Sequence, residues 1–230
     1  ETISLTLGSD TLFGACCHEI SHDTELLHSF IKAVKEQQIV LSSLFPYCID
    51  NNEYKLYVPA PIIQMESKNV PATSFDDVKT AIAAHKKIKR IEYIRASELQ
   101  QFNKYLQSDA SQKHMPTFGV KQTSAQVNMR GEKSLPYYVG NYQFMPNAGL
   151  YIIAGFHDDS HRTLFEGILE VLGLVGIGGK RSGGYGKFEL ADDPIELAEE
   201  GIYRDDSALY TLLHNVQGKV MCISACVPTS

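Results

Sequence analysis

The stretch GIGGKRSGGYGKFEL (Gly176–Leu190) combines an unusually bare backbone with concentrated positive charge. It places six glycines and three cationic residues within fifteen positions. The preceding HDDSHRTLFEGILEVLGLVG has the pattern of an amphipathic helix, and YGKFEL at the end of the stretch is typical of a strand. Glycine adopts positive φ angles cheaply and has no Cβ to shield its N–H group. We therefore expect a loop that leaves a helix, lets bare backbone approach a ligand, and enters a strand.

Two common phosphate-binding loops do not fit this stretch. A Walker A loop needs G-x-x-x-x-G-K-[S/T], but Lys180 is followed by Arg181, and Leu174 occupies the first glycine position. A dinucleotide-binding G-x-G-x-x-G motif needs a third glycine where Arg181 stands. Both motifs also leave a strand and open a helix, which is the reverse of the order expected here. The sequence therefore gives poor support to nucleotide binding.

The side chains of the loop suit an extended ribose-phosphate chain. Lys180 and Arg181 would supply phosphate contacts, Ser182 a hydroxyl group, and Tyr185 a face on which a base could stack. A plain turn that leads into a strand is the alternative interpretation. The residues of the loop thus favour RNA as the ligand, and no cofactor is expected.

The amino-acid composition limits the classes of protein to which the chain could belong. A chain of 230 residues with 43% hydrophobic and 21% charged residues is typical of one large or two small globular domains. The net charge of −6 argues against indiscriminate coating of nucleic acid, although a local RNA groove remains compatible with it. No apolar run approaches the roughly 18 residues of a membrane helix, and the five cysteines form no disulfide pattern. We expect a cytoplasmic protein with no membrane association.

The order of predicted elements defines the fold class. We expect helices over residues 9–20, 24–37, 76–107 and 157–176, and strands over 39–49, 148–156, 185–190 and 218–228. With one further strand before Glu1, this order becomes β-α-β-β-α-β. That order is the α+β, ferredoxin-like arrangement shared by RNA-recognition modules, here with a long insertion.

The segment HEISHDTELLH raises a metal-site hypothesis. It contains H-E-x-x-H at His18 to His22, followed by His28. On one continuous helix, His18 and His22 would share a face and could hold zinc, with Glu19 as general base. However, Glu25 occupies the position where the metzincin pattern has a turn glycine. We therefore expect surface histidines and no metal site.

The helix–loop–strand passage resembles the glycine-rich loop of the RAMP superfamily of CRISPR proteins. GLVGIGGKRSGGYGKFEL is close to the loop of one group, the Cas5-like 5′-handle-binding subunits of the type III-A (Csm) effector complex. LGSDTLFGACC is similar to the first helix of that group, and YYVGNYQF with GLYIIAGF follows its strands. The resemblance covers about residues 5–227 and is weakest in the middle insertion.

The resemblance implies a domain organisation. It predicts a ferredoxin-like RAMP domain over residues 1–190, with an insertion at about 50–147 that contains a thumb-like hairpin at about 117–147. Residues 191–230 would then be an acidic linker and the start of a second ferredoxin-like domain. Members of the group have a strand before LGSDTLFGA and a complete second domain, so we expect a chain that is trimmed at both ends.

The resemblance also implies a function. Members of the group are non-catalytic; they hold the 5′ handle of the CRISPR RNA and contact the large polymerase-like subunit and the backbone RAMP subunits. Within the segment Lys121–Tyr142, the thumb-like hairpin would bring Arg130 and Lys133 to the RNA. The RNA-cradling loop would consist of Gly178, Gly179, Lys180, Arg181, Ser182, Gly183, Gly184, Tyr185 and Gly186.

Two other classes of function remain open at this point. A RAMP endoribonuclease that processes CRISPR transcripts would share the fold and the loop, with His18 or His22 as a general acid–base. A zinc peptidase would use the H-E-x-x-H segment. The first would cut repeat RNA without partners, and the second would contain stoichiometric metal.

Overall fold

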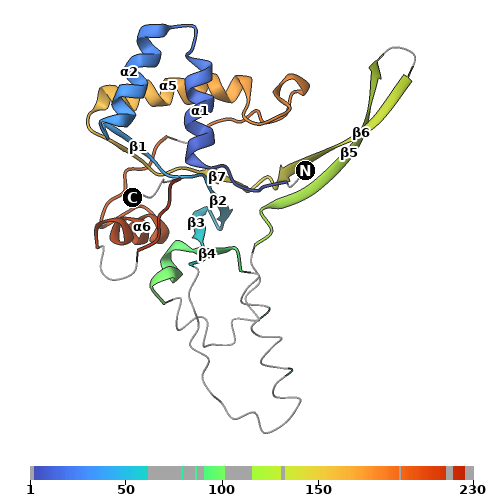
Figure 1. Ribbon diagram of the computed structural model, residues 1–230. Helices are drawn as coiled ribbons and strands as arrows, with labels where there is room; N and C mark the ends of the chain where they lie inside the picture. The colour runs from blue at the N-terminus through green and yellow to red at the C-terminus, as the bar shows by residue number, and fades with distance from the viewer. Residues whose placement is uncertain are drawn as a thin grey trace. The chain divides into compact units, whose positions relative to one another are not determined.

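The computed structural model describes residues 3–61, 79, 86, 91–101, 116–130, 133–191, 193–215 and 220–225. The helices are α1 (Ser9–Glu19), α2 (Thr24–Lys35), α5 (Asp159–Val175) and α6 (Arg204–His214), with 3-10 helices η1 (Ala96–Gln101) and η3 (Arg181–Gly183). The strands are β1 (Ile39–Leu41), β2 (Phe45–Asp50), β3 (Glu53–Pro59), β4 (Tyr93–Arg95), β5 (Gly119–Arg130), β6 (Lys133–Phe144), β7 (Ala148–Tyr151) and β8 (Ala154–Phe156). Figure 1 shows these elements.

The chain divides into two units, which are described separately. Unit 1 comprises Glu1–Leu5, Phe45–Gly149 and Leu197–Met221, and unit 2 comprises Thr6–Leu44, Leu150–Glu196 and Cys222–Ser230. The helices and antiparallel sheets of both units confirm the α+β class. No helix in the described ranges has the length and apolar character needed to cross a bilayer.

Unit 2 packs α1, α2 and α5 around one core (Figure 1). Strands β1 and β8 pair antiparallel beneath them, with Ile39 opposite Phe156. In α5, Phe165, Ile168 and Leu172 recur at helical spacing and are buried together with Phe30 of α2. The remaining buried members of this core are Leu12, Cys16, Ile20, Ala33 and Ile39. Burial of these apolar side chains is what holds α5, and therefore the start of the glycine-rich loop, against α1.

The ends of α5 follow from local sequence. Asp158 caps the N-terminus, because its carboxylate accepts a hydrogen bond from the backbone N–H of His161 at 3.0 Å. A hydrogen bond from the Ser160 hydroxyl, together with the one from the His161 N–H, holds the pKa of the Asp158 carboxyl well below its usual range. The helix ends at Gly176, whose φ of +90° favours glycine strongly.

A four-stranded sheet has the order β4-β3-β2-β7. Strands β4, β3 and β2 belong to unit 1, and the boundary between the units falls within β7. Strands β2 and β3 form a hairpin whose turn residues, Asn51 and Asn52, both have positive φ, as a two-residue hairpin turn requires. Strands β5 and β6 form a second, long hairpin (Figure 1). Helix α6 packs against β3 and η1.

Two predicted strands are each broken in the middle. The strand expected over 39–49 is split into β1 and β2, and the strand expected over 148–156 is split into β7 and β8. The two breaks face each other in unit 2, at Ser42 and Ile153. The N–H of Ser42 donates to the carbonyl of Ile153 at 2.8 Å. The N–H of Ile153 donates in return to the Ser42 hydroxyl at 2.9 Å. The Ser42 hydroxyl thus takes the place of a backbone carbonyl in the hydrogen-bond ladder of the sheet. A pattern of hydrophobic residues does not reveal this substitution.

Other expectations are wrong. Within the expected helix 76–107, Lys79 and Lys86 are helical, but 91–92 are irregular and 93–101 form β4 and η1, because β4 pairs with β3. The other residues of this range lie outside the described part of the chain. Residues 187–190 form no strand, since the N–H of Phe188 donates to the carbonyl of Gly173 in α5 instead. The described residues 220–225 are also irregular. Helix α1 begins at Ser9, and its N-cap residue is Gly8.

Candidate nucleic-acid interface

The base of the glycine-rich loop is closed by its own backbone. The N–H of Ile177 donates to the carbonyl of Gly186 at 2.9 Å. Gly186 has a φ of +77°, and a Cβ added there would lie 1.8 Å from the carbonyl oxygen of Ile177. Gly176 is similarly confined, because a Cβ there would lie 2.8 Å from the carbonyl oxygen of Tyr185. These two glycines are therefore required by the loop itself rather than by a ligand.

The interior of the loop divides its N–H groups between two uses. The N–H of Gly183 donates to the carbonyl of Lys180 at 3.0 Å, and that of Gly184 donates to the carbonyl of Arg181 at 2.9 Å. These donors stabilise η3 and are not available to a ligand. By contrast, the N–H groups of Gly178 and Gly179 have no hydrogen-bond partner in the described part of the chain, and both glycines are exposed. Only part of the loop thus offers bare amides.

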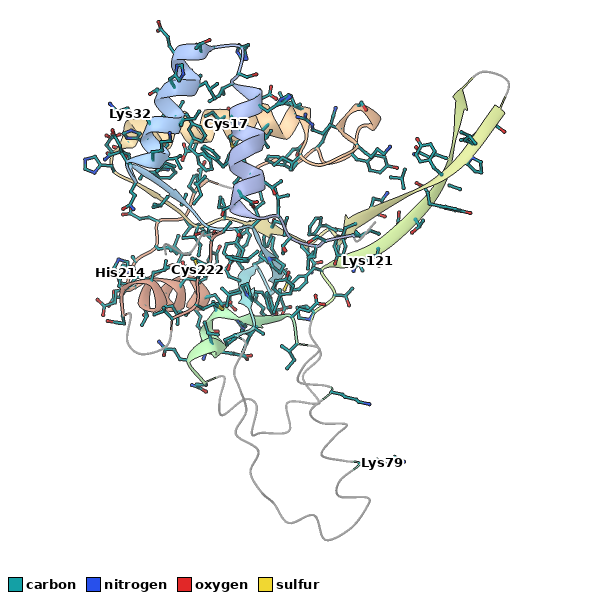
Figure 2. All side chains as sticks on the ribbon, viewed as in Figure 1. Cys17, Lys32, Lys79, Lys121, His214 and Cys222 are labelled. Atoms are coloured by element: carbon teal, nitrogen blue, oxygen red, sulfur yellow. The ribbon has the colours of Figure 1, made fainter. Side chains whose placement is uncertain are left out.

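The exposed part of the loop borders a depression. Its volume is about 500 Å³, and its lining combines the last turn of α1, the end of α5 and the loop. The lining residues are His18, Glu19, Val175, Gly178, Gly179, Arg181 and Ser182, all of them in unit 2. Cys17, labelled in Figure 2, marks this turn of α1. The depression therefore brings two cationic or polar loop side chains and two free amides together with a histidine and a carboxylate.

The predicted loop residues are distributed around this depression unequally. Gly178, Gly179, Arg181 and Ser182 line it, whereas Lys180 is exposed beside it and is not part of the lining. Gly183, Gly184, Tyr185 and Gly186 complete the loop away from the lining, with the Tyr185 side chain half-buried. The packing of α1 against α5 adds His18 and Glu19, which are distant from the loop along the sequence. No sequence signal links those two positions to the loop.

Arg130 and Lys133 lie in unit 1, at the closed end of the β5–β6 hairpin, where they pair with each other in the backbone register. The hairpin exposes large apolar side chains: Val127 is 59% exposed, Leu135 57% and Tyr138 73%. Lys121, labelled in Figure 2, is exposed on β5. The hairpin is therefore a second candidate surface, separate from the loop of unit 2.

The histidines do not have the helical arrangement on which the zinc hypothesis depends. Helix α1 ends at Glu19, so His18 and His22 do not share a helix face. The Nδ1 atom of His22 lies 3.0 Å from the backbone carbonyl oxygen of Glu19, in the turn before α2. Among the residues that the structure describes, no three His, Cys, Asp or Glu side chains are grouped to hold a metal ion. Cys16 is buried, and burial raises the pKa of its thiol to about 12, so this thiol stays protonated.

Comparison with solved structures gives the class of fold. A chain of the Csm3–Csm4 subcomplex in the type III-A CRISPR–Cas interference complex matches with a TM-score of 0.50 and 18% identity. The match covers 85% of this chain and 68% of that chain. At this identity the likeness shows a shared fold. No family model matches the sequence.

Comparison with curated proteins gives a particular relative. The chain is 24% identical over 230 residues to the CRISPR system protein Csm4 of Streptococcus thermophilus, covering 99% of this chain and 67% of the relative. It is 26% identical over 206 residues to Csm4 of Mycobacterium tuberculosis, covering 86% of this chain and 60% of the relative. The chain is thus a homologue of Csm4 proteins, which confirms the predicted relationship to the Cas5-like RAMP subunits. It spans about two thirds of the length of these relatives.

Proposed function

We propose that this chain is a non-catalytic subunit of a cytoplasmic type III-A CRISPR effector complex and binds the 5′ handle of the CRISPR RNA. The observation that carries the proposal is the pair of unpartnered amides at Gly178 and Gly179, which lie beside Arg181 in a homologue of Csm4. Backbone N–H groups and an arginine are the donors that hold phosphate oxygens without reading bases. An RNA backbone is therefore the ligand that this part of the loop fits best.

Partners of two kinds belong to the proposal. Solved complexes hold Csm4 proteins with Csm3 and with Csm1. By homology, this chain would contact backbone RAMP subunits and the large polymerase-like subunit, and would hold the handle where they meet. Val127 and Tyr138 share one face of the β5–β6 hairpin and are both exposed, so this face is where a contact with another subunit is proposed.

The finer description of the fold is also a proposal. It assigns residues 1–190 to one ferredoxin-like RAMP domain with an insertion at about 50–147, and 191–230 to an acidic linker and the start of a second domain. Unit 2 supports this assignment, because α1 and α5 share one core with the antiparallel β1–β8 pair. Arg130 and Lys133 would then contact RNA from the thumb-like hairpin.

Removing the loop cations tests the proposal. Replacing Lys180 and Arg181 together with alanine should weaken binding of an RNA that carries the repeat-derived handle. The logarithm of the affinity should also depend less steeply on the logarithm of salt concentration, by roughly one unit of slope for each phosphate that the variant no longer neutralises. Fluorescence anisotropy at several salt concentrations measures both quantities.

The matched control removes two cations from α2 of the same unit. Lys32→Ala with Lys35→Ala changes the net charge equally, and both side chains are exposed outside the lining of the depression. Lys32 is labelled in Figure 2. This control should keep the salt slope of the parent. Equal slopes for the loop variant and the parent would show that the loop does not bind the RNA backbone.

The same assay separates this proposal from the endoribonuclease alternative. A general acid–base needs a positioned histidine, and His18 is the histidine in the lining of the depression. On the present proposal the bound RNA is recovered at full length after incubation, with or without divalent metal. Cleavage that disappears in His18→Ala would instead assign the chain to the processing enzymes.

A further inference from the structure

We propose that the depression beside the glycine-rich loop is a subsite for one unpaired RNA base, and that Glu19 makes it selective for guanine. This inference rests on the proposed RNA-binding function and adds base selectivity to it. It concerns the α1 side of the depression, whereas phosphate binding concerns the loop side.

The dimensions of the depression suit one nucleotide. Its volume of about 500 Å³ lies within the roughly 300–1,000 Å³ of small-molecule sites. Val175, which is 37% exposed at the end of α5, supplies an apolar surface for the face of a base. The amides of Gly178 and Gly179 and the side chain of Arg181 border the same space and suit the attached phosphate. The lining therefore has an apolar part that suits the face of a base and an anion-binding part that suits a phosphate.

Glu19 does not fit a surface that binds phosphate alone. Its side chain is half-buried in the lining and has no hydrogen bond or ion pair to any described residue. A carboxylate near a phosphate is repulsive, and the C-terminal end of α1 adds a partial negative charge of its own. This end of the depression instead favours a group that donates hydrogen bonds. The free edge of a base is such a group.

Guanine is the base that matches a carboxylate best. Its Watson–Crick edge presents two neighbouring donors, the N1–H and the amino group, and a carboxylate can accept both at once. Adenine and cytosine each present one amino group, and uracil presents one N–H. Paired contacts to a base discriminate by about tenfold or more over bases that make one. Glu19 should therefore favour guanine over the other three bases by about tenfold.

His18 supplies the remaining contact. Its imidazole is exposed and belongs to the lining of the same depression as Val175. Histidine is among the aromatic side chains on which unpaired RNA bases stack, and such stacking does not depend on which base is present. His18 should thus contribute to the affinity for all four bases equally, unlike Glu19.

The test uses a pool of single-stranded RNAs, about eight nucleotides long and random in sequence, a length within the usual site size of single-strand-binding surfaces. The pool is bound to the purified chain and sequenced. The parent should enrich guanine about tenfold at one position. Glu19→Gln should lose this enrichment and should bind the other sequences as well as the parent or better, because a repulsive charge is gone. Structural damage would lower the affinity for every sequence. Loss of guanine enrichment with unchanged or higher affinity for the other sequences therefore identifies the role of Glu19.

Two controls make the test specific. Glu25→Gln removes the same charge from an exposed position on α2 outside the lining, and it should keep the guanine enrichment. His18→Ala should weaken every sequence to a similar degree, and His18→Phe should restore binding by stacking. Equal enrichment of guanine in the parent and in Glu19→Gln, or enrichment of another base in the parent, would overturn the inference.

The outcomes also distinguish this inference from the proposed function. If Lys180→Ala with Arg181→Ala loses RNA affinity while Glu19→Gln selects the same sequences as the parent, the loop binds RNA and the base subsite is wrong. If the parent binds none of the pool and none of the handle RNA, both are wrong.

Discussion

Replacing Asp205 with alanine is expected to lower the free energy of unfolding of unit 1 by about 3–5 kcal/mol. Asp205 is fully buried in the first turn of α6, with a relative exposure of 0%. Its carboxylate accepts hydrogen bonds from Arg95 Nε at 2.7 Å, from the Leu56 N–H at 3.0 Å and from the Ser97 N–H at 3.1 Å. Alanine would leave the Arg95 Nε–H and two part-buried amides without their acceptor, although Arg95 Nη2 keeps its ion pair with Glu53 at 3.2 Å. Each donor left unsatisfied away from water is costly.

Urea denaturation followed by circular dichroism measures this loss. Asp205→Asn keeps the shape of the side chain but not its charge, so it should fall between the parent and Asp205→Ala. Glu199→Ala is the control, because Glu199 is exposed in the same acidic segment and should change stability by less than about 0.5 kcal/mol. If Asp205→Ala unfolds at the same urea concentration as Glu199→Ala, this network does not hold α6 to β3 and η1.

The second large effect is expected at Gly186. Alanine there places a Cβ 1.8 Å from the backbone oxygen of Ile177 and forces a side chain into a φ of +77°. The hydrogen bond that closes the loop would then break, because neither backbone segment can give way easily. We expect Gly186→Ala to abolish measurable binding of handle RNA and to cost about 1–3 kcal/mol of stability through the strained backbone.

Gly179→Ala tests the contact with the ligand without straining the loop. A Cβ added there meets no atom within 4 Å, and its φ is not in the left-handed region, so Gly179→Ala should leave the stability almost unchanged. It should nevertheless weaken RNA binding by about tenfold, because the Cβ stands between the free amide and a phosphate. Gly167→Ala, at an exposed position of α5, is the control, with a small gain in stability and unchanged RNA affinity. Full RNA affinity in both Gly186→Ala and Gly179→Ala would show that the loop is only a turn.

Several elements could be predicted from the sequence because their signals are local. Helix α2 and helix α5 have amphipathic patterns, and the β5–β6 hairpin is marked by polar residues, glycine and proline. The position of the glycine-rich loop after α5 was likewise predictable, since Gly176 follows an apolar stripe that ends at Val175.

The remaining features depend on contacts between distant residues. Ser42 interrupts a strand because it meets Ile153, and Phe188 leaves the strand conformation because it meets Gly173. The depression has the same origin, since His18 and Glu19 reach the loop only through the packing of α1 against α5. Local patterns carry no information about such pairings, so nothing in the sequence links His18 and Glu19 to the loop.

Photo-crosslinking within the assembled complex identifies the residues that the 5′ handle contacts. The chain is purified together with its complex partners and the RNA they carry, irradiated, and digested with trypsin. We expect nucleotides of the 5′ handle to be attached to the loop, in the peptide Ser182–Lys187 that contains Tyr185 or in peptides around Gly178 and Gly179. Handle nucleotides attached solely to peptides outside residues 175–187 and the last turn of α1, or no handle RNA in the complex, would contradict this expectation.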